Sequence, residues 1–150
     1  MVRIYGVTTT SNTTSSGGTA VSIKIFGTTF QNGTVLLTLD GSGTETLTNI
    51  FSTATNKALS FTMNVVATTL PDSTQQQASW LVQGLLSKGA TSATVRYTLH
   101  HVMSLSNDTM KNCEITFQEN YSLGGLSILC KGVSQYNEIN WVATITGSEV

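Results

Sequence analysis

Apolar residues at every second position recur through this 150-residue chain and constrain its fold more than any other feature. The clearest case is residues 59–65, where leucine, phenylalanine, methionine and valine alternate with serine, threonine and asparagine. Successive side chains of a strand point to opposite faces, so this pattern is typical of a strand with one buried face. Residues 21–25, 95–99 and 139–145 show the same alternation. The pattern predicts a mainly β protein built from antiparallel strands.

One segment, from Pro71 to Gly89, carries its apolar residues at a helical period instead. Ser73 and Gln76 have the spacing of a capping box, and Gly89 stands where a helix would end. These features predict one α-helix over about residues 74–88. The expected architecture is therefore an antiparallel β-sandwich or barrel with one packed α-helix. The apolar stripe of this expected helix consists of Ala78, Leu81, Val82, Leu85 and Leu86.

The length fits a single β domain spanning residues 1–150. Within it, residues 8–19 (TTTSNTTSSGGT) contain no apolar periodicity. Such a tract offers no buried surface to offset its ordering entropy, and it predicts a flexible polar loop or arm. Residues 45–51 are expected to form a strand, and residues 104–112 a polar loop.

A hairpin is expected where Cys113, Ile115 and Phe117 share one strand face and residues 126, 128 and 130 share another. Pairing Glu119 with Gly124 sets Phe117 opposite Leu126 and Cys113 opposite Cys130. A disulfide between the two cysteines is geometrically conceivable. Two buried, reduced thiols fit a reducing compartment as well, and this second interpretation is favoured.

The surface is expected to be rich in hydroxyl groups and poor in charge. The chain has 26 threonines and 17 serines, whereas charged residues make up 10% of it and the net charge is −1. A protein that stays soluble alone usually carries more charge, which favours a surface covered by copies of the same chain. The absence of a basic cluster argues against nucleic-acid recognition, and no apolar run is long enough for membrane insertion.

No residue pattern indicates catalysis, a cofactor or a metal site, so the protein is not expected to be an enzyme. His100 and His101 are adjacent on a predicted strand and therefore point to opposite faces, which prevents them from sharing one metal ion. Trp80 and Trp141 are expected in the core or a subunit interface. Gly84 in the middle of a helix indicates a close backbone approach, by a strand of the same chain or of a neighbour.

The segment from Trp80 to Ile145 resembles the tail tube proteins of tailed bacteriophages in the order and spacing of its elements. WLVQGLLSKG is similar to the helix of that family, and TVRYTLHHV to the strand that follows it. NCEITFQENYSLGGLSILCKG and EINWVATITG are similar to its closing strands. The resemblance implies a virion structural protein, assembled in the host cytoplasm, that forms stacked hexameric rings. DNA would then be a non-specific cargo that passes through the channel.

Two further hypotheses remain open. A head-decoration or small capsid protein would share the threonine-rich β composition but form other oligomers. A carbohydrate-binding or adhesin-like β module, which belongs to another functional class, would remain monomeric and present an exposed aromatic side chain.

Overall fold

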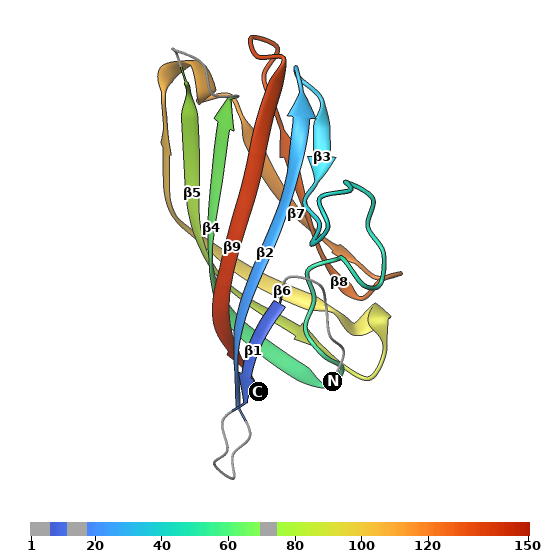
Figure 1. Ribbon diagram of the computed structural model, residues 1–150. Helices are drawn as coiled ribbons and strands as arrows, with labels where there is room; N and C mark the ends of the chain where they lie inside the picture. Colours follow the sequence, from blue (N-terminus) through green and yellow to red (C-terminus); the bar gives the residue numbers. More distant parts are fainter. Residues whose placement is uncertain (1–6, 12–17, 70–74) are drawn as a thin grey trace.

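The computed structural model describes residues 7–11, 18–69 and 75–150, which form two antiparallel β-sheets packed face to face (Figure 1). The strands are β1 (Val7–Ser11), β2 (Thr19–Phe30), β3 (Thr34–Leu36), β4 (Lys57–Thr69), β5 (Gln77–Lys88), β6 (Arg96–Ser106), β7 (Glu114–Asn120), β8 (Gly125–Lys131) and β9 (Glu138–Glu149). The larger sheet has the order β1-β2-β9-β4-β5-β6, and the smaller has the order β3-β8-β7. The mainly antiparallel β prediction is confirmed, and the structure is a sandwich without a closed barrel.

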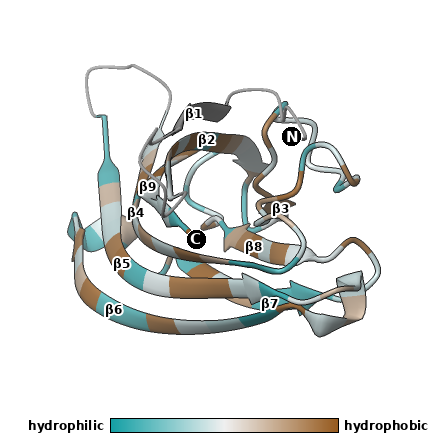
Figure 2. Cartoon of the chain, turned by 90° about the horizontal axis from the view of Figure 1, so that it is seen from below, coloured by the Kyte–Doolittle hydropathy of each residue, from teal (hydrophilic) through white to brown (hydrophobic). Residues whose placement is uncertain are grey.

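The hydrophobic core lies between the two sheets, as the alternation of apolar residues predicts. Along β4 every second residue from Leu59 to Thr69 is buried, and β9 buries Ile139, Trp141, Ala143 and Ile145. Figure 2 shows that the large sheet is curved and that β8 lies on its concave side. From the small sheet, Leu126, Ile128 and Cys130 join the same buried cluster.

The predicted α-helix over residues 74–88 is wrong. Residues 77–88 form strand β5, which pairs with β4 on one side and β6 on the other, and the described residues contain no α-helix. Residue 74 lies outside the described part of the chain. The short helices found are the 3-10 turns η1 (Ser92–Thr94) and η2 (Asp108–Met110).

The error has a simple cause in the spacing of the apolar residues. Ala78, Val82 and Leu86 are four residues apart, and a spacing of four keeps residues on one face of a strand as well as on one face of a helix. These three side chains are buried in the hydrophobic core. The remaining two members of the supposed stripe, Leu81 and Leu85, lie on the outward face of β5. Pairing with two neighbouring strands therefore overrides the local helical signal.

The predicted hairpin is present, but its register is displaced by two residues. Asn120 pairs with Gly125, and Phe117 pairs with Ile128 instead of Leu126. The four-residue loop begins at Tyr121, one residue later than predicted, because Gly124 closes the turn with a φ of 69° and donates its N–H to the Asn120 carbonyl. A shift of two residues preserves the strand faces, so the apolar residues remain inward.

Other segments also differ from the predictions. Residues 45–51 form turns instead of a strand, because the Asn49 side chain binds the Thr46 N–H and the Thr44 carbonyl and so replaces strand pairing. Strand β6 extends two residues past Ser104, into the predicted 104–112 loop. Residues 8–11 and 19, within the predicted 8–19 arm, are in β1 and β2, because β1 pairs with β2. The rest of that arm, apart from Gly18, is outside the described residues.

No helix in the described residues is both long enough and apolar enough to cross a membrane.

Candidate assembly surface

The outward surface of β4 and β5 carries no charged side chain. On both strands the inward residues are those that alternate into the core, and the register places the others together on the opposite face. Such a surface lacks the charges that usually keep an exposed sheet face solvated and separate from other proteins. The outward residues are Ala58, Ser60, Thr62, Asn64, Val66 and Thr68 on β4, and Gln77, Ser79, Leu81, Gln83, Leu85 and Ser87 on β5.

Strand β6 continues this surface with apolar side chains. The register places Met103 beside Leu81 and Leu105 beside Ser79. The exposed fractions are 37% for Val66, 48% for Leu85, 50% for Met103 and 60% for Leu105. We call the outward surface of β4, β5 and residues 98–106 of β6 the neutral face. Exposed apolar residues grouped on one uncharged face are typical of an interaction surface.

The end of β6, from Val102 to Ser106, is open on both of its faces. All residues from His100 to Ser106 are exposed. The first half is held from the inside by β7: the Tyr97 hydroxyl donates to the Phe117 carbonyl at 3.0 Å, and the His101 ring meets the Phe117 ring edge to face at 6.0 Å. Burial, followed by the Glu119 charge, raises the pKa of Tyr97 above its ordinary value of 10.0, so the hydroxyl remains a donor at neutral pH.

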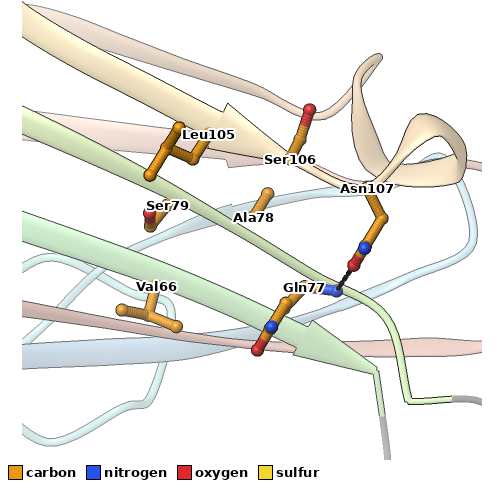
Figure 3. Close-up of a pocket in the computed structure, with 7 residues that line it drawn as sticks. All are labelled: Val66, Gln77, Ala78, Ser79, Leu105, Ser106 and Asn107. Carbon is orange, nitrogen blue, oxygen red and sulfur yellow. Dashed lines mark hydrogen bonds between the residues drawn. The ribbon is translucent and has the colours of Figure 1, made fainter.

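A hollow of about 430 Å³ opens at the end of the neutral face, where β5 begins and β6 ends (Figure 3). The backbone N–H of Gln77 donates to Asn107 Oδ1 at 2.7 Å, and the N–H of Asn107 donates to the Gln77 carbonyl at 3.1 Å. These two bonds fix the two strand ends to each other. The lining combines apolar groups with neutral amides and hydroxyls, and it consists of Val66, Gln77, Ala78, Ser79, Leu105, Ser106 and Asn107.

The two cysteines are free, buried thiols, in line with the favoured interpretation. Cys130 pairs with Ile115 and not with Cys113, so the predicted cross-strand position is wrong. Burial raises the pKa of Cys113 to about 11, and burial together with Cys113 raises that of Cys130 further. Both thiols are therefore protonated at neutral pH. Because the thiolate is the reactive form, neither cysteine is expected to act as a nucleophile.

The two tryptophans form one stacked pair inside the sandwich, with ring centroids 5.5 Å apart and an interplanar angle of 21°. Trp141 is fully buried, and its Nε1–H donates to Thr29 Oγ1 at 2.9 Å. His100 lies on the outward side of β6 and His101 on the side that faces β7, as expected from their adjacent positions. Within the described ranges, no three His, Cys, Asp or Glu side chains are grouped to hold a metal ion.

The exposed apolar residues of β6 could have been found from the sequence. Met103 and Leu105 alternate with Ser104 and Ser106, which is a strand pattern. This strand pattern was missed because residues 104–112 were predicted to be a polar loop. The apolar residues Leu81 and Leu85 were likewise concealed by their assignment to a helix.

Comparison with known proteins gives a likeness of fold. No family model and no curated protein sequence matches the chain. Among solved structures, the chain is similar to tailspike protein gp49 of Acinetobacter baumannii bacteriophage Fri1, a capsular polysaccharide depolymerase. The TM-score is 0.50 at 6% identity, over 94% of this chain and 19% of the tailspike. The tailspike protein of Acinetobacter phage vB_ApiP_P1 gives a TM-score of 0.43 at 11% identity, over 99% of this chain and 23% of that protein.

This chain thus spans about a fifth of the length of the tailspikes that it resembles. At such low identity the likeness concerns the fold alone. The chain has a β fold that is also found in a segment of a phage tailspike.

Proposed function

We propose that the protein is a non-catalytic structural component of a phage virion and that it works by assembling with copies of itself. The neutral face is the observation that supports this most directly. An uncharged sheet surface with exposed Val66, Leu85, Met103 and Leu105 gains free energy when a partner covers it. The likeness of fold to a phage tailspike segment is consistent with a place in the tail.

The more specific form of this proposal is a tail tube subunit. Six copies would form a ring, and stacked rings would surround a channel through which DNA passes as a non-specific cargo. The resemblance of the strands after residue 94 to the tail tube family supports this form, although residues 80–88, which were likened to the family's helix, lie in strand β5. The hydroxyl-rich surface would suit a channel that does not retain phosphate groups. A head-decoration or small capsid protein remains the alternative within the same class.

Sedimentation velocity and negative-stain electron microscopy of the purified chain test the proposal. Self-association at micromolar concentration is expected in either form. Open rings or tubes would support the tail tube, whereas closed oligomers without a channel would support a decoration or shell role. A chain that remains monomeric at several hundred micromolar would contradict the proposal.

The hollow favours one function from a different class, the binding of a neutral saccharide. Gln77, Ser79, Ser106 and Asn107 provide amide and hydroxyl groups beside Leu105, a mixture that suits sugar hydroxyls and ring carbons. Isothermal titration with neutral oligosaccharides, comparing the wild type with Asn107→Ala, would test this function. Binding that the substitution abolishes, in a protein that remains monomeric, would replace the assembly proposal.

A further inference from the structure

Strand β6 has a free edge that is unusually long and unusually poor in charge. It lies at the end of the six-stranded sheet, and no other strand in the described part of the chain pairs with its outer side. An unpaired edge presents a row of backbone N–H and C=O groups that can template another strand. Natural edges are commonly protected by lysine, proline or a short length. Strand β6 runs for 11 residues and has one permanently charged side chain, Arg96 at its start.

The second half of this strand has few contacts of its own. From Val102 to Ser106 its side chains are exposed on both faces, and β5 is its one strand neighbour within the described ranges. Ordering the backbone of a strand costs conformational entropy. Pairing and side-chain contact on the outer side would offset that cost. The occupant of this edge should therefore be a strand.

We propose that this occupant is β6 of a second copy, paired antiparallel across a two-fold axis so that the two large sheets become one. This inference rests on the proposed self-assembly and adds a contact at the sheet edge, which is separate from the neutral face because edge pairing leaves that face uncovered. Two antiparallel strands of 11 residues exchange about ten hydrogen bonds, which is comparable with a typical stable protein interface. The axis is perpendicular to the sheet, so the neutral faces of the two copies lie on the same side.

Length and charge both favour β6 over the opposite edge of the sheet as the partner. The opposite edge is β1, which has five residues and would leave more than half of β6 unpaired. A second copy of β6 has the same length, so the two strands can pair over nearly their whole length. Pairing Tyr97 with Ser106 of the antiparallel copy keeps inward side chains opposite inward ones, because the β-bulge at Val102 reverses the alternation along β6. Arg96 then lies opposite Asn107, just beyond the paired stretch, so no like charges face each other. This register sets His101 of one copy opposite Val102 of the second, so the two Val102 residues lie beside the two-fold axis.

The β-bulge lies at the middle of the strand. Val102 is the extra residue, since Leu81 pairs with Met103 and Val82 pairs with His101. A bulge leaves its extra residue out of the ladder with the neighbouring strand, so a substitution at Val102 does not disturb a β5 partner. Val102 is therefore a suitable reporter position.

The first experiment introduces charge at the edge. Leu105→Lys and Met103→Lys each appear twice in a two-fold interface, so each is expected to raise the dimer dissociation constant by about tenfold or more in sedimentation velocity. Leu47→Lys is the matched control, because Leu47 is 68% exposed and lies in the turns that follow β3. Circular dichroism and urea unfolding verify that all three variants are folded.

The second experiment detects the pairing directly. In Val102→Cys the new thiol is the accessible one, since Cys113 and Cys130 are both buried. Mild oxidation is expected to give a covalent dimer, whereas Leu47→Cys should remain monomeric on denaturing gels.

The outcomes separate this inference from the proposed function. Unchanged association of the folded lysine variants, or a wild type that associates while Val102→Cys fails to cross-link, overturns the β6 pairing and leaves self-assembly intact. A wild type that does not associate overturns both.

Discussion

Asp40 organises the long connection between β3 and β4 at the scale of single residues. Its carboxylate accepts hydrogen bonds from the Thr38 hydroxyl at 2.9 Å, the Ser42 N–H at 3.1 Å and the Asn49 side-chain amide at 3.2 Å. These hydrogen bonds hold the pKa of Asp40 well below its ordinary value of 3.8, and the bond from the Ser42 backbone N–H has the largest effect. The charged form is therefore the one that the folded connection prefers.

This preference predicts a pH-dependent contribution to stability. A carboxyl group with a lowered pKa in the folded state stabilises the protein above its unfolded pKa, near 4, and loses that contribution as the pH falls toward the folded value. Asp40→Asn should therefore unfold at lower urea concentration than the wild type at pH 6, and the difference should shrink below pH 4. Urea unfolding between pH 2.5 and 6 measures this, with Asp108→Asn as the control at another exposed aspartate. An equal difference at both ends of the pH range would contradict it.

The bond between Trp141 and Thr29 gives a second prediction at this scale. Both residues are buried, so Thr29→Val leaves the indole N–H without a partner in the core and should cost about 1–3 kcal/mol. Thr29→Ser, which retains the hydroxyl, should cost less. In a Trp141→Phe background the effect of Thr29→Val should largely disappear, because no indole N–H remains to be satisfied. Urea unfolding of the four proteins would show a non-additive cycle, and strict additivity would refute the interpretation.

Single residues were predictable where burial alone decided their position. The inward placement of Ile139, Trp141 and Ile145 follows from their alternation with polar neighbours. The network around Asp40 was not predictable, because its donors are two side chains and a backbone N–H whose positions depend on the fold of residues 38–49. The stacking of Trp80 on Trp141 likewise joins residues far apart in sequence, on strands that are separated by β4.

At the scale of elements, β5 shows why periodicity alone can mislead. Its inward residues occur at every second position. Two of them, Trp80 and Gly84, are not aliphatic, so the aliphatic residues alone do not show this alternation. The aliphatic residues that remain, Ala78, Val82 and Leu86, fit a helix equally well. The deciding contribution is the pairing of all 12 residues with β4 or β6, and pairing between strands is not encoded locally. Strands β4 and β9 were predicted correctly because their apolar residues alternate with polar ones, a pattern that does not fit a helix.

Gly84 gives the prediction that belongs to β5. A Cβ at this position would lie 2.4 Å from the Phe61 ring and 2.6 Å from a methyl group of Leu99, on the two strands that flank it. The close approach at Gly84 is therefore made by side chains of the two neighbouring strands, whereas the sequence had predicted an approach by backbone. Gly84→Ala should cost about 1–3 kcal/mol through overpacking.

Urea unfolding of Gly84→Ala beside Gly18→Ala tests this. At Gly18 the nearest atom to a new Cβ is 3.8 Å away, so that substitution is sterically permitted. A Gly84→Ala variant as stable as Gly18→Ala would mean that Phe61 and Leu99 move aside without cost.

At the scale of the whole molecule, the sandwich and its core were predictable, whereas the candidate surface was not. Core positions share a chemical signature, since apolar residues alternate with polar ones. The neutral face has no such signature in the sequence: Thr62, Asn64 and Gln83 are ordinary polar residues until the register places them beside Leu81 and Met103. The low overall charge did indicate an uncharged surface. Its location required the strand order.

Self-association through such a surface predicts that thermal stability depends on protein concentration. If the folded chain binds its own copies and the unfolded chain does not, mass action stabilises the folded state. For a dimer above its dissociation constant, each tenfold rise in concentration contributes about 0.7 kcal/mol per chain, half of the usual 1.4. In a domain of this size that corresponds to a rise of about 1–3 °C in Tm.

Calorimetry of the wild type over a hundredfold range of concentration should therefore show a rising Tm. Leu105→Lys, which places a charge in the exposed apolar part of β6, should show a smaller rise over the same range, because its dimer dissociation constant is larger. The Tm of Leu47→Lys should rise as that of the wild type does, because residue 47 lies outside β6 and the neutral face. An equal rise of Tm in all three proteins would place the association on another surface of the sandwich. A flat Tm in the wild type would mean that the exposed apolar side chains of β6 remain in contact with water.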